Sequence, residues 1–183
     1  VSNGKTIELL LKEATATIGE NITLRRVSRV VKSDAQGFGS YKHMGGRIVA
    51  LVVLDKKDDD TAKDISMHVA AQKPQYLDRN QVDAETLEHE RHILTQQALA
   101  EGKPANIVEK MIEGRLNKFL KEITLVDQPF VKDPDQTVSQ YVSSKQNNVV
   151  SFVRLEVGEG IEKKAEMSFA DEVAAAQAAA AAQ

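Results

Sequence analysis

The chain has 183 residues, of which 42% are hydrophobic and 28% charged, and its net charge at pH 7 is −3. This is the composition of a globular protein of one or two domains with a buried core, and its charge is too balanced to indicate nucleic acid or an anionic membrane as the main partner. The absence of cysteine excludes disulfides and thiolate metal sites, and the longest apolar run, residues 48–54, is far too short to span a membrane.

The first 36 residues predict a helix followed by a strand. Apolar residues recur at helical spacing between residues 6 and 15. Residues 22–32 are rich in β-branched side chains, which favours a strand, although polar and apolar residues do not alternate cleanly there. Because side chains alternate between the two faces of a strand, the basic residues of this segment would be split rather than gathered into a patch: Arg25, Arg26 and Arg29.

Two strands and a helix are predicted next. The strands, over residues 37–41 and 47–54, would flank a hairpin turn at residues 43–46 that contains two glycines. Thr61 or Asp60 is expected to cap the helix that follows.

A protruding helical hairpin is predicted for residues 83–131. Gly102 and Pro104 mark its turn, since glycine often follows the end of a helix and proline often stands at the start of one. The first helix, over residues 84–101, carries a narrow apolar stripe that can pair with only one other helix. We expect the two helices to meet through five apolar side chains: Leu94, Leu99, Val108, Ile112 and Leu116. An arm of this kind usually contacts a partner.

The remaining residues predict a short helix over 137–144, a strand over 149–157 and a tail over 161–183. One face of the strand is apolar (Val149, Val153, Leu155 and Val157) and the other is mixed (Phe152, Arg154 and Glu156), which indicates a sheet with one covered and one wetter face. The alanine-rich tail favours a helix, and a docked helix and a frayed end remain equal alternatives.

No convincing active site emerges from the residues alone. His89 and His92 lie one helical turn apart, but a zinc protease would need the second histidine at position 93, which is isoleucine, so a solvated helix face is the better interpretation. His68 is expected to pack against the core. For His43 an incidental place in a glycine-rich turn is favoured over a contact with another surface, although the glycines would allow close approach.

The residues therefore leave two classes of function open: a protein-interaction factor that acts on a larger partner, and a scaffold or dimerisation module. An enzyme that uses His43 and a nearby carboxylate is a weaker third hypothesis, which a deep pocket of converging polar groups would favour. The predicted fold class is α+β: a small antiparallel sheet covered by helices, with an inserted antiparallel helical coiled-coil hairpin and a C-terminal helix.

A series of short motifs runs in order along the chain: Ile18-Gly19-Glu20-Asn21-Ile22, Arg25-Arg26-Val27, Gly39-Ser40-Tyr41-Lys42-His43, Met67-His68-Val69-Ala70-Ala71, Gly102-Lys103-Pro104, Glu113-Gly114-Arg115, Gln128-Pro129-Phe130-Val131, and residues 154–163. With these motifs the chain resembles the bacterial translation elongation factor Ts family over essentially its whole length. The resemblance implies four regions: residues 1–36 as the remainder of a first core subdomain, 37–82 with 132–160 as a second, 83–131 as the coiled coil, and 161–183 as a C-terminal helical module.

The resemblance also implies a function. Members of this family are guanine nucleotide exchange factors that promote GDP release from elongation factor Tu by binding the nucleotide-free GTPase, without a chemical step of their own. Family positions that match Ile18, Gly19 and His43 lie at that interface, so His43 becomes an expected contact. The expected partner-binding residues are Ile18, Gly19, Tyr41, His43, Met44 and Gly45. We expect no catalytic or metal-binding residue, no cofactor, no direct contact with nucleic acid or a membrane, and a cytoplasmic location; a homodimer stays open.

One departure from the family concerns the start of the chain. Full-length members begin with a small three-helix domain and then carry a Thr-Asp-Phe-Val motif whose Phe wedges into the GTPase near its magnesium site. Neither occurs here, no signal peptide is visible, and the chain begins with Val1. We therefore expect a fragment or processed form that corresponds to the later two-thirds of the family, with weaker binding and slower exchange than a full-length factor.

Overall fold

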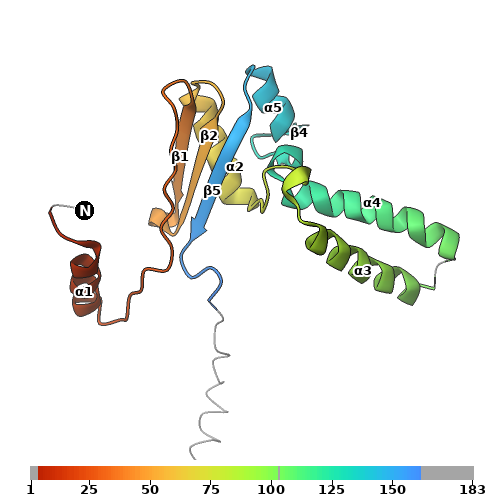
Figure 1. Ribbon diagram of the computed structural model, residues 1–183, viewed down its shortest axis with the longest axis horizontal. Coiled ribbons are helices and arrows are strands. Elements are labelled where there is room, and N and C mark those ends of the chain that lie inside the picture. The colour runs from red at the N-terminus through yellow and green to blue at the C-terminus, as the bar shows by residue number, and fades with distance from the viewer. Residues whose placement is uncertain (1–3, 103, 162–183) are drawn as a thin grey trace, which may run out of the picture.

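The computed structural model describes residues 4–102 and 104–161, and it shows a central body with one helix on one side and a helical arm on the other (Figure 1). The fold is α+β, as predicted. Three antiparallel strands lie in the order β1-β2-β5, with α2 packed on one face of the sheet: β1 Gly37–His43, β2 Ile48–Leu54, β5 Val149–Glu156 and α2 Asp59–Gln72. The predicted C-terminal helix falls outside the described residues.

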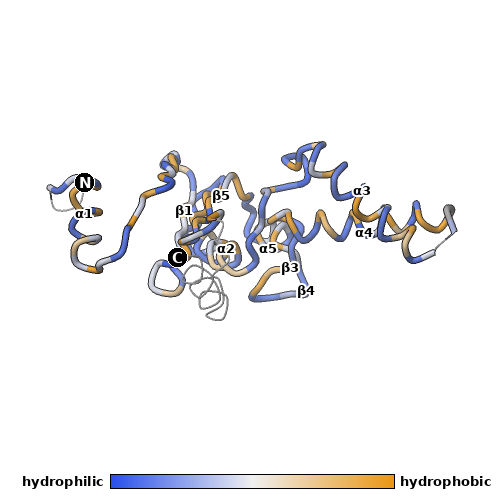
Figure 2. Tube along the Cα trace, turned by 90° about the horizontal axis from the view of Figure 1, so that it is seen from below, coloured by the Kyte–Doolittle hydropathy of each residue, from blue (hydrophilic) through white to orange (hydrophobic). Residues whose placement is uncertain are grey.

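The core of the body lies between the sheet and α2, where Figure 2 shows hydrophobic residues gathered. Every second residue of β2 points toward α2, since a strand alternates its side chains between two faces. The buried side chains of this cluster are those of Ile48, Ala50, Val52 and Leu54 from β2, Ala62, Ile65, Val69 and Ala70 from α2, and Leu125, Phe130, Val138 and Val142 from the segments that follow the arm.

Helix α2 begins earlier than the sequence predicts. Its cap is Asp58, not Thr61 or Asp60: the Asp58 carboxylate accepts a hydrogen bond from the backbone N–H of Thr61 at 3.0 Å. Hydrogen bonds from Thr61 also hold the pKa of Asp58 below its ordinary value. Several polar residues before the first apolar one could all serve as a cap, so composition alone did not select the right one.

The faces of β5 are arranged in a way that the apolar pattern did not predict. Pairing with β2 sets Phe152 opposite Val52, Arg154 opposite Ala50 and Glu156 opposite Ile48, and directly paired residues of an antiparallel sheet share a face. The mixed face therefore lies toward α2, whereas Val153 and Leu155 occupy the uncovered face. The charge of Arg154 is tolerated there because its Nε donates to the carbonyl of Ala70 at 3.4 Å and its Nη2 lies 2.8 Å from Glu156.

The segment before β1 contains the predicted helix but not the predicted strand. Helix α1 spans Ile7–Ile18, capped by the Thr6 side chain at its start and by Gly19 at its end. Residues 20–33 have no regular secondary structure, so the strand predicted for residues 22–32 is wrong for the described structure. A strand needs a neighbour to satisfy its backbone groups, and among the described residues none pairs with this segment.

The arm is a hairpin of two helices, α3 Ala84–Ala100 and α4 Ala105–Ile123 (Figure 1). Leu94, Val108, Ile112 and Leu116 lie between the helices as predicted, but Ala98 is fully buried there and Leu99 is 56% exposed. The prediction of Leu99 was wrong because Leu94 and Ala98 are one helical turn apart and share a face, whereas Leu99 lies outside that face. Coiled-coil packing of the hairpin stays a prediction.

An ion pair, a side-chain hydrogen bond and backbone hydrogen bonds fix the base of the arm to the body. Arg79, in the short helix η2 (Arg79–Gln81), lies 2.6 Å from Asp127 and donates to Asn117 at 3.1 Å. The backbones of Tyr76 and Leu125 also bond across this junction at 2.9 Å. Beyond it lie η3 Leu125–Asp127, β3 Pro129–Phe130, β4 Asp133–Thr137 and α5 Val138–Ser144. Within the described ranges, no helix is both long and apolar enough to cross a membrane.

Candidate protein-interaction site

The turn between β1 and β2 displays its residues on a constrained backbone. The short helix η1 (Met44–Gly46) has positive φ at all three positions: 50° at Met44, 68° at Gly45 and 99° at Gly46. Glycine adopts this conformation at no steric cost, whereas methionine does so only under strain. A Cβ atom on Gly45 would meet nothing within 4 Å, so the glycine is needed for the backbone conformation and leaves the surface open.

Side chains on this turn form an exposed platform that is anchored in the core. Tyr41 is half-buried and packs against the core of the body. The His43 ring stacks on Tyr41 with 6.1 Å between ring centroids and 26° between planes, and His43 is exposed. Met44 beside it is 65% exposed. The His43 ring, fixed by its stacking on Tyr41, and the flexible thioether of Met44 are suited to contact with another protein surface.

The two other expected contact residues lie elsewhere, at the end of α1. Ile18 is 60% exposed, and Gly19 ends the helix with a φ of 79° and an N–H bond to the carbonyl of Thr15 at 2.9 Å. Helix α1 stands apart from β1 and β2 (Figure 1). The structure therefore presents two separate exposed points rather than one continuous site.

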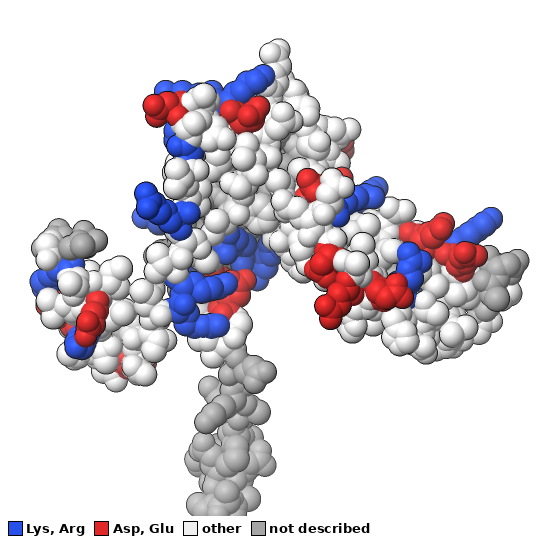
Figure 3. Space-filling view, viewed as in Figure 1, with Lys and Arg blue, Asp and Glu red and all other residues white. Residues whose placement is uncertain are grey.

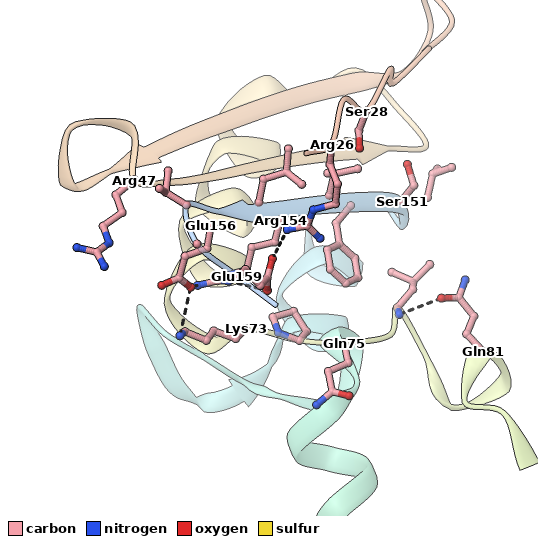
Figure 4. Close-up of a pocket in the computed structure, with 18 residues that line it drawn as sticks. Arg26, Ser28, Arg47, Lys73, Gln75, Gln81, Ser151, Arg154, Glu156 and Glu159 are labelled. Carbon is pink, nitrogen blue, oxygen red and sulfur yellow. Dashed lines mark hydrogen bonds and ion pairs between the residues drawn. The ribbon is translucent and has the colours of Figure 1, made fainter. Parts of the chain in front are cut away.

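An open hollow of about 1060 Å³ runs along β5 and holds most of the charged contacts of the body (Figure 4). Lys73 lies 3.4 Å from Glu156, and Arg154 lies 2.8 Å from the same carboxylate. The hydrogen bond from Arg154, then the bond and charge of Lys73, lower the pKa of Glu156. Arg26 pairs with Glu159 at 2.7 Å. These charged groups pair with one another and do not converge on a common point where a ligand could bind. The arrangement is therefore suited to joining segments of the chain.

His68 is fully buried and links α2 to the exit of the arm. Its Nδ1 accepts the backbone N–H of Val131 at 3.1 Å, so the ring proton lies on Nε2, which donates to Oε1 of Gln128 at 2.9 Å. Burial lowers the pKa of His68 below its ordinary 6.5. The expectation of a packed histidine is confirmed, and its bond to Gln128 gives that side chain a structural part.

We expect protonation of His68 to lower the free energy of unfolding as the pH drops below about 6.5. The folded state binds fewer protons than the unfolded chain there, so this contribution is complete above the unfolded pKa and is lost as the pH falls from the unfolded pKa through the lower pKa of the folded state. Urea unfolding between pH 5 and 7.5 should show a flatter pH dependence in His68→Gln than in the wild type. His92→Gln, at an exposed position on α3, is the control. Equal slopes in His68→Gln and the wild type would contradict this account.

Within the described residues, no group of three or more histidine, aspartate or glutamate side chains is placed to hold a metal ion. His89 and His92 are both exposed on α3. Figure 3 shows charged side chains of both signs on the arm and at the upper and lower ends of the body, among larger areas of uncharged residues.

Comparison with known families decides the relationship. A profile described as Elongation factor TS matches residues 1–159. The chain belongs to the elongation factor Ts family. Two relatives named Elongation factor Ts, from Pediococcus pentosaceus and Levilactobacillus brevis, are 60% and 59% identical to it over 161 and 162 residues. Each match covers 88% of this chain and 55% of the relative, so the chain spans about half the length of these curated relatives.

All six expected contact residues fall within the part of the chain that the family profile matches. Sequence reasoning missed a different group, the cluster around Glu159. Its only signal was the pair Arg25 and Arg26, which we expected to point to opposite faces of a strand. Without the strand, both side chains reach Glu159: Arg25 donates to its carbonyl at 2.6 Å and Arg26 pairs with its carboxylate.

Proposed function

We propose that this protein acts in translation elongation as a guanine nucleotide exchange factor for elongation factor Tu. Membership of the elongation factor Ts family is the observation that carries this proposal. An exchange factor works by binding the nucleotide-free GTPase more tightly than the GDP-bound form, because a factor with equal affinity for both would shift nothing. By linkage, binding of the factor lowers the affinity of the GTPase for GDP, and rebinding of nucleotide lowers its affinity for the factor.

The proposed contacts are Ile18 and Gly19 at the end of α1 and Tyr41, His43, Met44 and Gly45 on the β1–β2 turn. Exposure of the His43 ring and of Met44 supports the second contact, as does the anchoring of the platform through Tyr41. A partner surface can approach the turn closely because Gly45 presents bare backbone. On this proposal the protein needs no cofactor or chemical step of its own and works in the cytoplasm.

The proposal is tested by mixing the purified chain with elongation factor Tu loaded with a fluorescent GDP. We expect binding in titration experiments and faster release of the labelled nucleotide. A full-length factor of the family should bind more tightly and release GDP faster, because it carries the wedge motif. A chain that does not bind elongation factor Tu would contradict the proposal and favour the scaffold hypothesis.

His43 gives this test a single-residue form. We expect His43→Ala to weaken binding to elongation factor Tu by about 1–2 kcal/mol, as for an interface anchor, with little change in the melting temperature. His92→Ala, the same change at an exposed position on the arm, should alter neither quantity. A lower melting temperature with unchanged affinity per folded molecule would instead assign His43 a purely structural part in the turn.

A further inference from the structure

We infer that Glu159 is a positioning residue: it fixes residues 20–33 against the body and thereby sets the orientation of α1 relative to the β1–β2 turn. The functional part of this inference rests on the proposed function, because α1 carries one of the proposed contacts and the turn carries the other. The structural part does not depend on any partner.

Three guanidinium groups surround Glu159. Arg26 Nη2 lies 2.7 Å from Oε2 of Glu159, and Arg25 Nη1 donates to the backbone carbonyl of Glu159 at 2.6 Å. On the other side, Arg154 Nη1 lies 3.7 Å from Oε1. The two arginines of residues 20–33 and the arginine of β5 thus meet at one residue (Figure 4 labels Arg26, Arg154 and Glu159).

Arg154 connects this cluster to the core. Its side chain is only 7% exposed, and it is held by the carbonyl of Ala70 in α2 at 3.4 Å and by Glu156 at 2.8 Å. Glu159 is also fixed through its own backbone, since its N–H bonds to the carbonyl of Glu156 at 3.2 Å. A charge-assisted chain therefore runs from Arg26 through Glu159 and Arg154 to α2.

The rest of residues 20–33 has little else to hold it. Among the described residues, every hydrogen bond and ion pair that joins this segment to the sheet and its helices ends on Glu159. Only Ile22 and Val30 of the segment are half-buried, and α1 has no buried residue. Exposed ion pairs are individually weak, but within residues 4–102 and 104–161 no stronger hydrogen bond or ion pair competes with them, so a small free energy is enough to decide the orientation.

A fixed orientation would favour binding of a partner that touches both regions. When two contact regions are held in the geometry of the complex beforehand, less conformational freedom is lost on association. If α1 moved freely, only the molecules with α1 in the orientation of the complex could bind at both regions. The affinity would then be multiplied by the fraction of molecules in that orientation.

The structural part can be measured without a partner. Because the chain contains no cysteine, Ala16→Cys on α1 and Ser143→Cys on α5, both at exposed positions, would carry the only two spin labels. We expect a narrow distribution of label-to-label distances in the otherwise unchanged chain and a broad one in Glu159→Gln. Salt at about 1 M should broaden the first distribution, because exposed charges are screened.

Glu156→Gln is the matched control. It makes the same change three residues away and also removes a partner of Arg154, but within the described part of the chain Glu156 has no bond to residues 20–33. Its distance distribution should stay narrow. If Glu159→Gln is as narrow as this control, or if both broaden equally, the inference is wrong.

Binding to elongation factor Tu tests the functional part. We expect Glu159→Gln to bind about fivefold more weakly than the unchanged chain and Glu156→Gln to bind equally well. An unchanged chain that fails to bind overturns the proposed function, whereas the distance measurement still decides the structural part. Normal binding by a Glu159→Gln chain whose distances have broadened shows that orientation does not matter and overturns the functional part alone.

Discussion

Replacing Gly39 with alanine should lower the free energy of unfolding of the body by about 3 kcal/mol or more, at or above the upper end of the range for overpacked sites. A Cβ atom at this position of β1 would lie 2.2 Å from the carbonyl carbon of Ala62 and from the backbone N of Lys63. Both are main-chain atoms of α2, which cannot move aside as a flexible side chain can. Helix α2 would have to lift from the sheet and open the core, and urea unfolding would measure the loss.

Gly114→Ala is the matched control, because the same methyl group would meet nothing within 4 Å there. Gly114 lies inside α4, where alanine is the better helix former by about 1 kcal/mol, so this variant should be slightly more stable than the wild type. A Gly39→Ala chain with wild-type stability would mean that β1 and α2 are not in contact as described.

The glycines of β1 illustrate what the sequence could and could not predict. Gly37 and Gly39 lie two positions apart in β1, and nothing in that local spacing shows what they do. Their actual part, letting α2 approach the strand, depends on an element that begins twenty residues later in the chain. Strands β1 and β2 were predictable, since the apolar run of β2 and the two glycines of the turn are local signals.

Elements that depend on a distant neighbour were predicted less well. Residues 22–32 have the composition of a strand, but composition does not supply the strand beside them. The mixed face of β5 lies toward α2, where hydrogen bonds to Ala70 and Glu156 offset the burial of the Arg154 charge. Arg25 and Arg26 met at Glu159 for the same reason: their partner is more than 130 positions away.

The candidate site shows a related limit. From its residues alone the turn at His43 was a hairpin with an incidental histidine, and its geometry still contains no partner. The structure adds that the ring is exposed, stacked on Tyr41 and flanked by bare backbone. Ranking it as a contact depends on the resemblance to a family, because a protein interface is a property of two surfaces and one chain carries only half of it.

Replacing Ile112 with aspartate should open the arm while the body stays folded. Ile112 is 7% exposed and packs with Leu94, Ala98 and Val108 between α3 and α4. A carboxylate there loses its hydration without gaining a partner, at a cost of about 3–5 kcal/mol. Hydrogen exchange should become faster across residues 84–123, whereas amides of β2 and β5 keep their protection.

Local opening is expected because the arm and the body have separate apolar clusters. One cluster lies between α3 and α4 and the other between the sheet and α2. The contacts between the two parts include polar ones, among them the ion pair of Arg79 with Asp127 and the backbone bond of Tyr76 with Leu125. Ile107→Asp, on the exposed side of the same helix at 46% exposure, should leave exchange nearly unchanged throughout. If Ile112→Asp instead exposes the amides of β2 and β5 together with those of the arm, the two clusters unfold as one unit, and the arm is an integral part of the body rather than an independently stable hairpin.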